Sequence, residues 1–269
     1  MARAWCLIRE QVHYRREAFL QGLAAAGYEI AQSAREEGNP NFSRSGAGDV
    51  LVIWNRYGHY EDWAREFERR SGRVLVAENG YLGDDSNGRQ HYALAVGQHN
   101  GGGRWHVGGP ERWRALGIGL KPWRTDGGHI LICPQRGIGP KDYVQRANWQ
   151  HRLADRLKGV TKRPVRIRPH PGNVPQAEAR ASLARDLDGC WAMVTWASGA
   201  GIHALVAGVP VFYEAPYWIL AGAGERSVLD IDNPHYLARE EAFVKLSWAQ
   251  WTLAELATGE PFRLLAALP

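Results

Sequence analysis

Short apolar runs alternate along the chain with segments of helical periodicity, and this alternation restricts the fold more than any other feature. In the first half the runs are Trp5–Ile8, Val50–Trp54 and Val74–Ala77. They lack strict polar–apolar alternation, as expected of parallel strands buried on both faces. Helical patterns lie between them, over Tyr14–Ala26 and Tyr60–Arg70, and each is followed by a glycine. A strand–helix–strand order predicts right-handed crossovers and a parallel sheet.

A second series of the same kind follows residue 128. Its expected strands are His129–Cys133, Val165–Arg168, Trp191–Thr195 and Val209–Phe212, and its expected helices are Tyr143–Leu157, Gln176–Leu187 and Gly199–Ala207. The glycine- and proline-bearing stretch 117–128 separates the two series. We therefore predict an α/β protein with two Rossmann-like domains, residues 1–120 and 121–238. A final segment, 239–269, is expected to contain a long helix over Glu240–Thr258.

Composition excludes several other classes of protein. Hydrophobic residues make up 45% and charged residues 23% of the 269 residues, which are globular proportions, not those of a disordered or collagen-like chain. The three cysteines are far apart and odd in number, which argues for a reducing compartment and against a disulfide framework or cysteine-based zinc site. The first residues do not resemble a signal peptide, so we expect a cytoplasmic protein.

One stretch has the length of a membrane span. Trp191 to Tyr213 covers 23 residues without a formal charge. Its glycines and Pro210 divide it into a strand, a helix and a second strand, so we expect no membrane partner.

Positive charge is concentrated in the middle of the chain. Residues 101–200 contain 17 Lys and Arg against 7 Asp and Glu, whereas the remaining residues contain 16 against 21. Such a basic segment predicts a partner that carries phosphate or another anion. The alternative is a solvated surface that happens to be rich in arginine.

Three loops at expected strand ends in the second half carry groups suited to an anion. In the stretch after Thr195, Gly199 and Gly201 would let backbone N–H groups approach a phosphate at a helix start, and Ser198 could donate its hydroxyl. The alternative is that Ser198 only caps the helix and the glycines only permit close packing.

The other two loops supply side chains. His170 stands between two prolines just after Arg168, where it could donate a hydrogen bond or a proton to a leaving phosphate. Arg136 lies in the glycine-containing loop after Cys133.

The first half offers a carboxylate. The run Val74–Ala77 leads directly into Glu78-Asn79-Gly80, so Glu78 would sit at the carboxyl end of a parallel strand, before a glycine turn. That position suits a general base. A plain turn-forming sequence is the alternative.

Taken in order, these motifs resemble a group of GT-B glycosyltransferases: the bacterial sialyltransferase-like and capsule Kdo-transferase-like enzymes and related polysaccharide-biosynthesis transferases. That group has an acidic-acidic-Gly motif, an HP motif and a serine motif, here Glu78-Asn79-Gly80, His170-Pro171 and Ser198. The resemblance covers residues 74–212. The sequence departs from the motifs at two positions: Asn79 stands where the group has its second acidic residue, and Ala197 stands where some relatives have another serine.

The resemblance implies two domains facing across a cleft, with the C-terminal helix packing back across them. It implies an enzyme that transfers a sugar from a nucleotide sugar to an acceptor hydroxyl with inversion. Glu78 would be the base, and Arg136, Arg168, His170, Ser198, Gly199 and Gly201 would bind the nucleotide, with His170 also catalytic. The nucleotide sugar is a co-substrate, and no other cofactor is expected. No HxH or HxxxH pattern occurs, so we expect no metal.

The acceptor stays open between two classes, and the oligomeric state is not predicted. Trp105, Trp113 and Trp123 stand among arginines and lysines, an arrangement that suits stacking on sugars or on DNA bases, although packing between domains would also explain it. The basic charge favours a hydroxylated base in DNA, which would have to be extruded from the duplex. The alternatives are a surface or capsular glycan, or a non-catalytic module that binds a phosphorylated ligand or nucleic acid.

Overall fold

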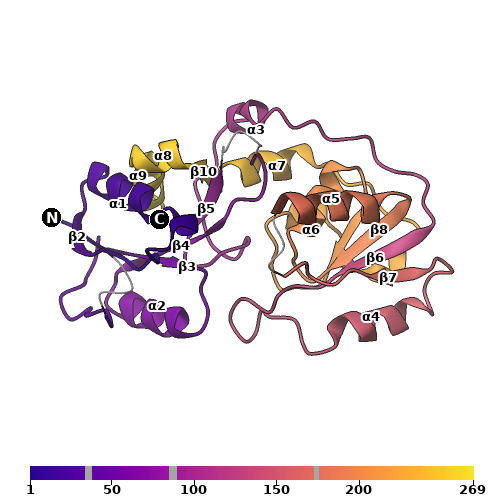
Figure 1. The fold of residues 1–269 in the computed structure, drawn as a ribbon, viewed down its shortest axis with the longest axis horizontal. Coiled ribbons are helices and arrows are strands. Elements are labelled where there is room, and N and C mark those ends of the chain that lie inside the picture. Colours follow the sequence, from indigo (N-terminus) through magenta and orange to yellow (C-terminus); the bar gives the residue numbers. More distant parts are fainter. Residues whose placement is uncertain (34–37, 85–89, 173–175) are drawn as a thin grey trace. The chain divides into compact units, whose positions relative to one another are not determined.

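The chain forms two α/β units, each built around its own sheet (Figure 1). The structure is a computed structural model that describes residues 1–33, 38–84, 90–172 and 176–269. Unit 1 comprises Met1–Leu116 and Val244–Pro269, and unit 2 comprises Gly117–Phe243. The C-terminal segment therefore returns to the first unit.

In the described residues, unit 1 contains a six-stranded sheet in the order β10-β5-β4-β3-β1-β2. Strands β1 to β4 are parallel, and β5 is antiparallel to both of its neighbours. The strands are β1 (Arg3–Cys6), β2 (Glu29–Gln32), β3 (Val50–Trp54), β4 (Arg73–Asn79), β5 (His91–Val96) and β10 (Gln250–Thr252).

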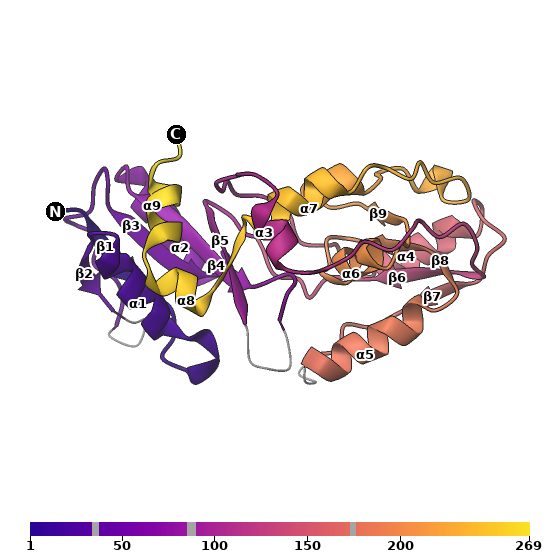
Figure 2. The ribbon, with the colours of Figure 1, turned by 90° about the horizontal axis from the view of Figure 1, so that it is seen from above.

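Helices cover both faces of this sheet (Figure 2). One face carries α1 (Arg16–Ala25), α8 (Leu253–Ala257) and α9 (Glu260–Ala266), and the other carries α2 (His59–Arg69). Strand β3 shows the reason: Val50 and Val52 pack in the core with Phe19 of α1, whereas Leu51 packs with Phe67 of α2. Successive strand residues point to opposite faces, so an unbroken apolar run needs cover on both sides. Two short helices, α3 (Glu111–Ala115) and the 3-10 turn η1 (Val12–Tyr14), lie in the loops.

Unit 2 has a parallel sheet in the order β7-β6-β8-β9. Its strands are β6 (His129–Cys133), β7 (Val165–Ile167), β8 (Cys190–Thr195) and β9 (Val211–Tyr213). Helix α4 (Trp149–Leu157) packs on one face, and α5 (Gln176–Leu187) and α6 (Ala200–Val206) lie on the other (Figure 1). The 3-10 turns η3 (Ala221–Ala223) and η4 (Val228–Asp230) follow, and α7 (Glu240–Ser247) contains the junction back to unit 1.

The two sheets share one topology around their first strand. In unit 1 the second strand, β2, pairs on one side of β1 and the third, β3, on the other; in unit 2, β7 and β8 flank β6 in the same way. At such a switch point the loops after the two central strands lead to opposite faces of the sheet, and ligands of open α/β sheets bind there. The switch points lie between β1 and β3, and between β6 and β8.

Several elements differ from the sequence prediction. The expected helix over Glu240–Thr258 is interrupted by β10, which pairs with β5, and α8 restarts with a capping box between Thr252 and Glu255. The first sheet is not wholly parallel, because the chain reverses directly after β4 and forms β5 instead of a crossover helix. The stretch Trp191–Tyr213 forms β8, α6 and β9, as expected, and none of the helices in the described ranges is long and apolar enough to cross a bilayer.

Candidate functional site

All four strands of unit 2 end at one edge of the sheet. Ile167 lies beside Ile132, and Cys133 lies beside Thr195, which in turn lies beside Tyr213. The loops that follow these strands therefore leave from the same row. This edge carries the second-half residues that the sequence marked for anion binding: Arg136, Arg168, His170, Ser198, Gly199 and Gly201.

His170 lies within the electrostatic influence of two of these groups, Arg136 and Arg168. Partial desolvation of its ring, together with the charges of Arg136 and Arg168, holds the pKa of His170 below 6.5. The backbone N–H of Gly172 donates to its Nδ1 at 3.0 Å. The neutral ring therefore carries its proton on Nε2, and at neutral pH His170 offers an N–H donor instead of a transferable proton.

The two arginines differ in how they are held. Arg168 donates from Nε to Asp186 Oδ2 of α5 at 2.6 Å, and its side chain is only 11% exposed. Arg136 lies in the loop after β6, and no carboxylate of the described ranges forms an ion pair with it. Arg136 is thus the cation more available to a ligand, while Arg168 contributes its charge from a fixed position.

The corner between β8 and α6 is fastened by Thr195, which the sequence analysis missed. Its fully buried hydroxyl donates to the Cys133 carbonyl at 2.9 Å and accepts from the Ser198 N–H at 2.8 Å. Ser198 Oγ accepts from the Ala200 N–H at 3.3 Å, so the hydrogen of this hydroxyl can serve a ligand. The only sequence signal for Thr195 was a polar residue at the end of a buried strand.

The two glycines of this corner, Gly199 and Gly201, differ in the space that surrounds them. A Cβ added to Gly201 would lie 2.8 Å from the Trp218 ring, so this buried glycine makes room for the indole. A Cβ added to the exposed Gly199 would meet no atom within 4 Å. Packing accounts for Gly201, and Gly199 leaves the corner open to solvent.

In unit 1, Glu78 lies within β4 and not in the turn that follows, because it pairs with Ala93 of β5. One carboxylate oxygen, Oε1, accepts both the Tyr81 hydroxyl at 2.6 Å and the Asn100 N–H at 2.7 Å. The side chain is partly exposed at the carboxyl end of the strand. Its orientation is therefore set by two donors while part of the group stays accessible.

Arg9 is a second charged group at this edge that sequence reasoning did not single out. Arg9 lies in the loop after β1, at the switch point of unit 1. The register of β1 with β3 and of β3 with β4 places this loop at the same edge of the sheet as the ends of those two strands. Burial lowers the pKa of Arg9, but Tyr14, Tyr60 and Tyr57 outweigh it, so the pKa of Arg9 is raised. An arginine directly after an apolar run was the only signal in the sequence.

The structure thus divides the predicted residues between the units. Arg136, Arg168, His170 and Ser198 share the carboxyl edge of unit 2, and Glu78 lies at the carboxyl edge of unit 1. Within the described ranges, no three His, Cys, Asp or Glu side chains come together in a way that could hold a metal ion. Burial raises the pKa of Cys133 and of Cys190 to about 12, so neither thiol is a nucleophile at neutral pH.

Comparison with known proteins shows a likeness in fold. No protein-family model matches the chain, and no curated protein matches it in sequence. The solved structure of the Thermosulfurimonas dismutans KpsC beta Kdo 2,7 transferase is similar, with a TM-score of 0.51 and 11% identity over 96% of this chain and 98% of that one. The beta Kdo 2,4 transferase of the same KpsC gives a TM-score of 0.53 and 11% identity over 91% and 90%. The chain therefore has an α/β, GT-B-like fold of the kind seen in these glycosyltransferase structures, as predicted.

Proposed function

We propose that the protein is a glycosyltransferase that moves a sugar from a nucleotide-activated donor to an acceptor hydroxyl. The observation that supports this proposal is that Arg136, His170 and Ser198 follow three neighbouring strands, β6, β7 and β8, at the carboxyl edge of the sheet of unit 2. They come from three different loops. The His170 and Ser198 side chains accept hydrogen bonds from the protein and keep their own hydrogens for a ligand, and Arg136 supplies a positive charge. Such a set suits the phosphates of a nucleotide.

The same residues would stabilise the leaving group. As the bond from the anomeric carbon to the phosphate oxygen breaks, its electron pair stays on the phosphate and negative charge grows there. Arg136 would neutralise that charge, and the His170 Nε2–H and the Ser198 hydroxyl would donate to it. One preorganised donor of this kind contributes about 2.7–4 kcal/mol to the transition state.

Glu78 would act as the base. Its Oε2 would take the proton of the acceptor hydroxyl while that oxygen forms the new bond to the anomeric carbon. A single displacement of this type inverts the anomeric centre. A positioned base contributes roughly 10²–10⁴ in rate. The proposal assigns no step to a metal ion.

For the acceptor we propose a glycan in preference to DNA, because the two similar solved structures are named Kdo transferases and because part of the basic, tryptophan-containing segment has partners within the protein. Trp105 donates to the Lys245 carbonyl at 2.8 Å, and Trp123 lies against Arg239, whose guanidinium carbon is 3.9 Å from the ring centroid. Arg124 donates to the carbonyl of Leu187 at the end of α5. Titration with duplex DNA at rising salt tests this choice: binding that falls steeply between about 50 and 200 mM salt would favour DNA.

The central experiment is incubation with a panel of nucleotide sugars and acceptors, with nucleotide release as the measurement. We expect Glu78→Gln to abolish transfer and to leave nucleotide affinity within about twofold, since the base acts on the acceptor and not on the nucleotide. Glu29→Gln is the matched control, because Glu29 is exposed on β2 of the same unit. Equal turnover in Glu78→Gln and wild type would remove the base assignment. Nucleotide binding without transfer from any donor would favour the non-catalytic module.

A further inference from the structure

The C-terminal segment reaches into the loop that follows Glu78 through one side chain, Gln250 of β10. This side chain is fully buried, and both ends of its amide are used. Gln250 Oε1 accepts from the N–H groups of Tyr81 at 2.7 Å and Leu82 at 3.0 Å, and Nε2 donates to the Leu82 carbonyl at 2.7 Å. Three hydrogen bonds from one buried amide hold the backbone of residues 81 and 82 in a single position.

Tyr81 connects this held loop to the carboxylate. Its hydroxyl and the Asn100 N–H both donate to Glu78 Oε1, at 2.6 and 2.7 Å. Two donors on one oxygen fix the rotation of the carboxylate. Oε2 receives no hydrogen bond from the described part of the chain and is the oxygen left to take a proton.

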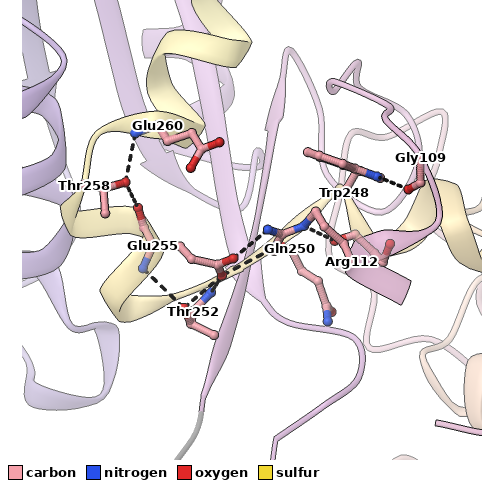
Figure 3. Close-up of polar contacts among 9 residues, drawn as sticks. Gly109, Arg112, Trp248, Gln250, Thr252, Glu255, Thr258 and Glu260 are labelled. Atoms are coloured by element: carbon pink, nitrogen blue, oxygen red, sulfur yellow. Dashed lines mark hydrogen bonds and ion pairs between the residues drawn. The ribbon is translucent and has the colours of Figure 1, made fainter. Parts of the chain in front are cut away.

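Gln250 is itself fixed from the other side (Figure 3). Arg112 Nη2 donates to the Gln250 carbonyl at 2.8 Å, and Arg112 Nη1 pairs with Glu255 Oε1 at 2.6 Å. The guanidinium carbon lies 4.0 Å from the ring centroid of Trp251, so the arginine also stacks on the strand it binds. The amide of Gln250 therefore starts from a rigid strand.

We propose that Gln250 is a positioning residue for Glu78 and acts through Tyr81. Gln250 touches no reacting group; it holds the loop whose tyrosine orients the base. This inference rests on the proposed function, in which Glu78 Oε2 deprotonates the acceptor. It assigns the C-terminal segment a part in the reaction. Gln250 and Tyr81, the two residues that connect this segment to the loop after Glu78, are 169 residues apart in sequence.

The test uses the full-length chain and three variants. Gln250→Met keeps the length of the side chain and removes all three hydrogen bonds, and Tyr81→Phe removes only the hydroxyl that reaches Glu78. Gln21→Met makes the same chemical change as the first at an exposed position of α1 and is the control. The ¹³C resonance of the Glu78 carboxyl carbon, assigned by its loss in Glu78→Gln, reports the orientation of the base without any turnover.

We expect the Glu78 resonance to move in Gln250→Met in the same direction as in Tyr81→Phe, and to stay in place in Gln21→Met. Turnover should fall about 10-fold or more in Gln250→Met, with UDP and CMP affinities changed by less than about twofold. Addition of Tyr81→Phe to Gln250→Met should cause little further loss, because both changes break one chain of contacts.

An unmoved Glu78 resonance in Gln250→Met, with a shifted one in Tyr81→Phe, overturns the positioning role. So does a double variant whose resonance shift is the sum of the two single shifts. If no donor in the panel is turned over but the resonance moves as expected, the positioning role stands and only the proposed function fails.

Discussion

At the residue scale, His170 shows how neighbouring charges set what a side chain can do. A lone histidine between two prolines suggests either a donor or an acid. The lowered pKa, caused by desolvation and by Arg136 and Arg168, leaves the ring neutral at pH 7. The bond from the Gly172 N–H then selects Nε2 as the donor. In the protein without a ligand, the two arginines that would attract a phosphate thus also favour the neutral form of His170.

This electrostatic balance predicts a proton linked to nucleotide binding. A bound phosphate offsets the nearby positive charge and raises the pKa of His170, so binding takes up a proton and the affinity increases as the pH falls through the pKa of His170 in the complex. Calorimetry with UDP in buffers of different ionisation enthalpy measures the uptake. His170→Gln should lose the His170-dependent part, whereas His151→Gln, at an exposed site on α4, should keep it. Identical proton uptake in wild type and His170→Gln would count against this role.

The two glycines of the β8–α6 corner give a matched pair. Gly201→Ala forces a Cβ to within 2.8 Å of the Trp218 ring, and we expect this overpacking to cost about 1–3 kcal/mol of stability. Gly199→Ala meets no atom within 4 Å and should leave the stability nearly unchanged. Chemical denaturation of the two variants measures the difference. A stable Gly201→Ala variant would contradict the packing assignment.

At the scale of elements, residues 250–252 form the strand β10 because tertiary contacts stabilise the strand more than helical hydrogen bonds would stabilise a helix there. Apolar residues at helical spacing continue from α7 into α8, but Trp251 is buried in the core of unit 1 and Gln250 is held by the loop after β4. Arg112 binds the Gln250 carbonyl, stacks on Trp251 and pairs with Glu255. These contacts outweigh a helical preference worth only tenths of a kcal/mol per residue.

The ion pair between Arg112 and Glu255 predicts a pH dependence of stability. Burial raises the pKa of Glu255, but hydrogen bonds from Arg112 and Thr252 outweigh it, and the pKa lies below 4.5. A carboxyl whose pKa is lowered on folding stabilises the protein above its unfolded pKa, and that contribution is lost as the pH falls through the folded value. The stability difference between wild type and Glu255→Gln should therefore be full above pH 4.5 and shrink below it. A difference that is the same at pH 7 and at about pH 3 would contradict this assignment.

At the scale of the whole molecule, the first unit is assembled from both ends of the sequence. Leu256, Phe262 and Leu265 of α8 and α9 are buried in one core with Phe19 of α1 and with β1, β3, β4 and β5. In the described residues, the core cluster on the parallel sheet of unit 2 runs from Ile130 to Ile231 and includes none of the C-terminal segment. The last elements of unit 1 therefore follow unit 2 in the sequence.

Deletion of residues 248–269 tests this division. The deletion removes β10, α8 and α9 and exposes the α1 face of the first sheet. We expect the amides of β1, β3 and β4 to lose hydrogen-exchange protection, while those of β6 and β8 keep theirs, because their core does not include the deleted segment. Equal loss of protection in both sheets would show that the units do not keep separate cores.

Much of this architecture could be predicted from local patterns. Val50–Trp54, His129–Cys133 and Gln176–Leu187 form the strands and the helix expected, with the same bounds. Strands β2, β5 and β10 could not be predicted in this way. Strands β2 and β10 have only four and three residues and are mixed in polarity, and β10 forms against β5, which is distant in sequence. Strand β5 is a buried run of six residues, but its antiparallel pairing with β4 and β10 is set by the tertiary structure. Two polar partners of the site, Asp186 and Gln250, likewise have no local signature.

The sequence by itself determined the fold class, because runs of apolar residues with strand and helix periods leave few ways to bury both faces of a sheet. It also indicated which loops would carry charge, since a polar residue just after a parallel strand must lie at the carboxyl edge. Only the tertiary structure decided which groups act on each other: the charge of Arg136 on His170, the Tyr81 hydroxyl on Glu78, and the Gln250 amide on the backbone of Tyr81. These pairings depend on strand order and register, which no local pattern encodes.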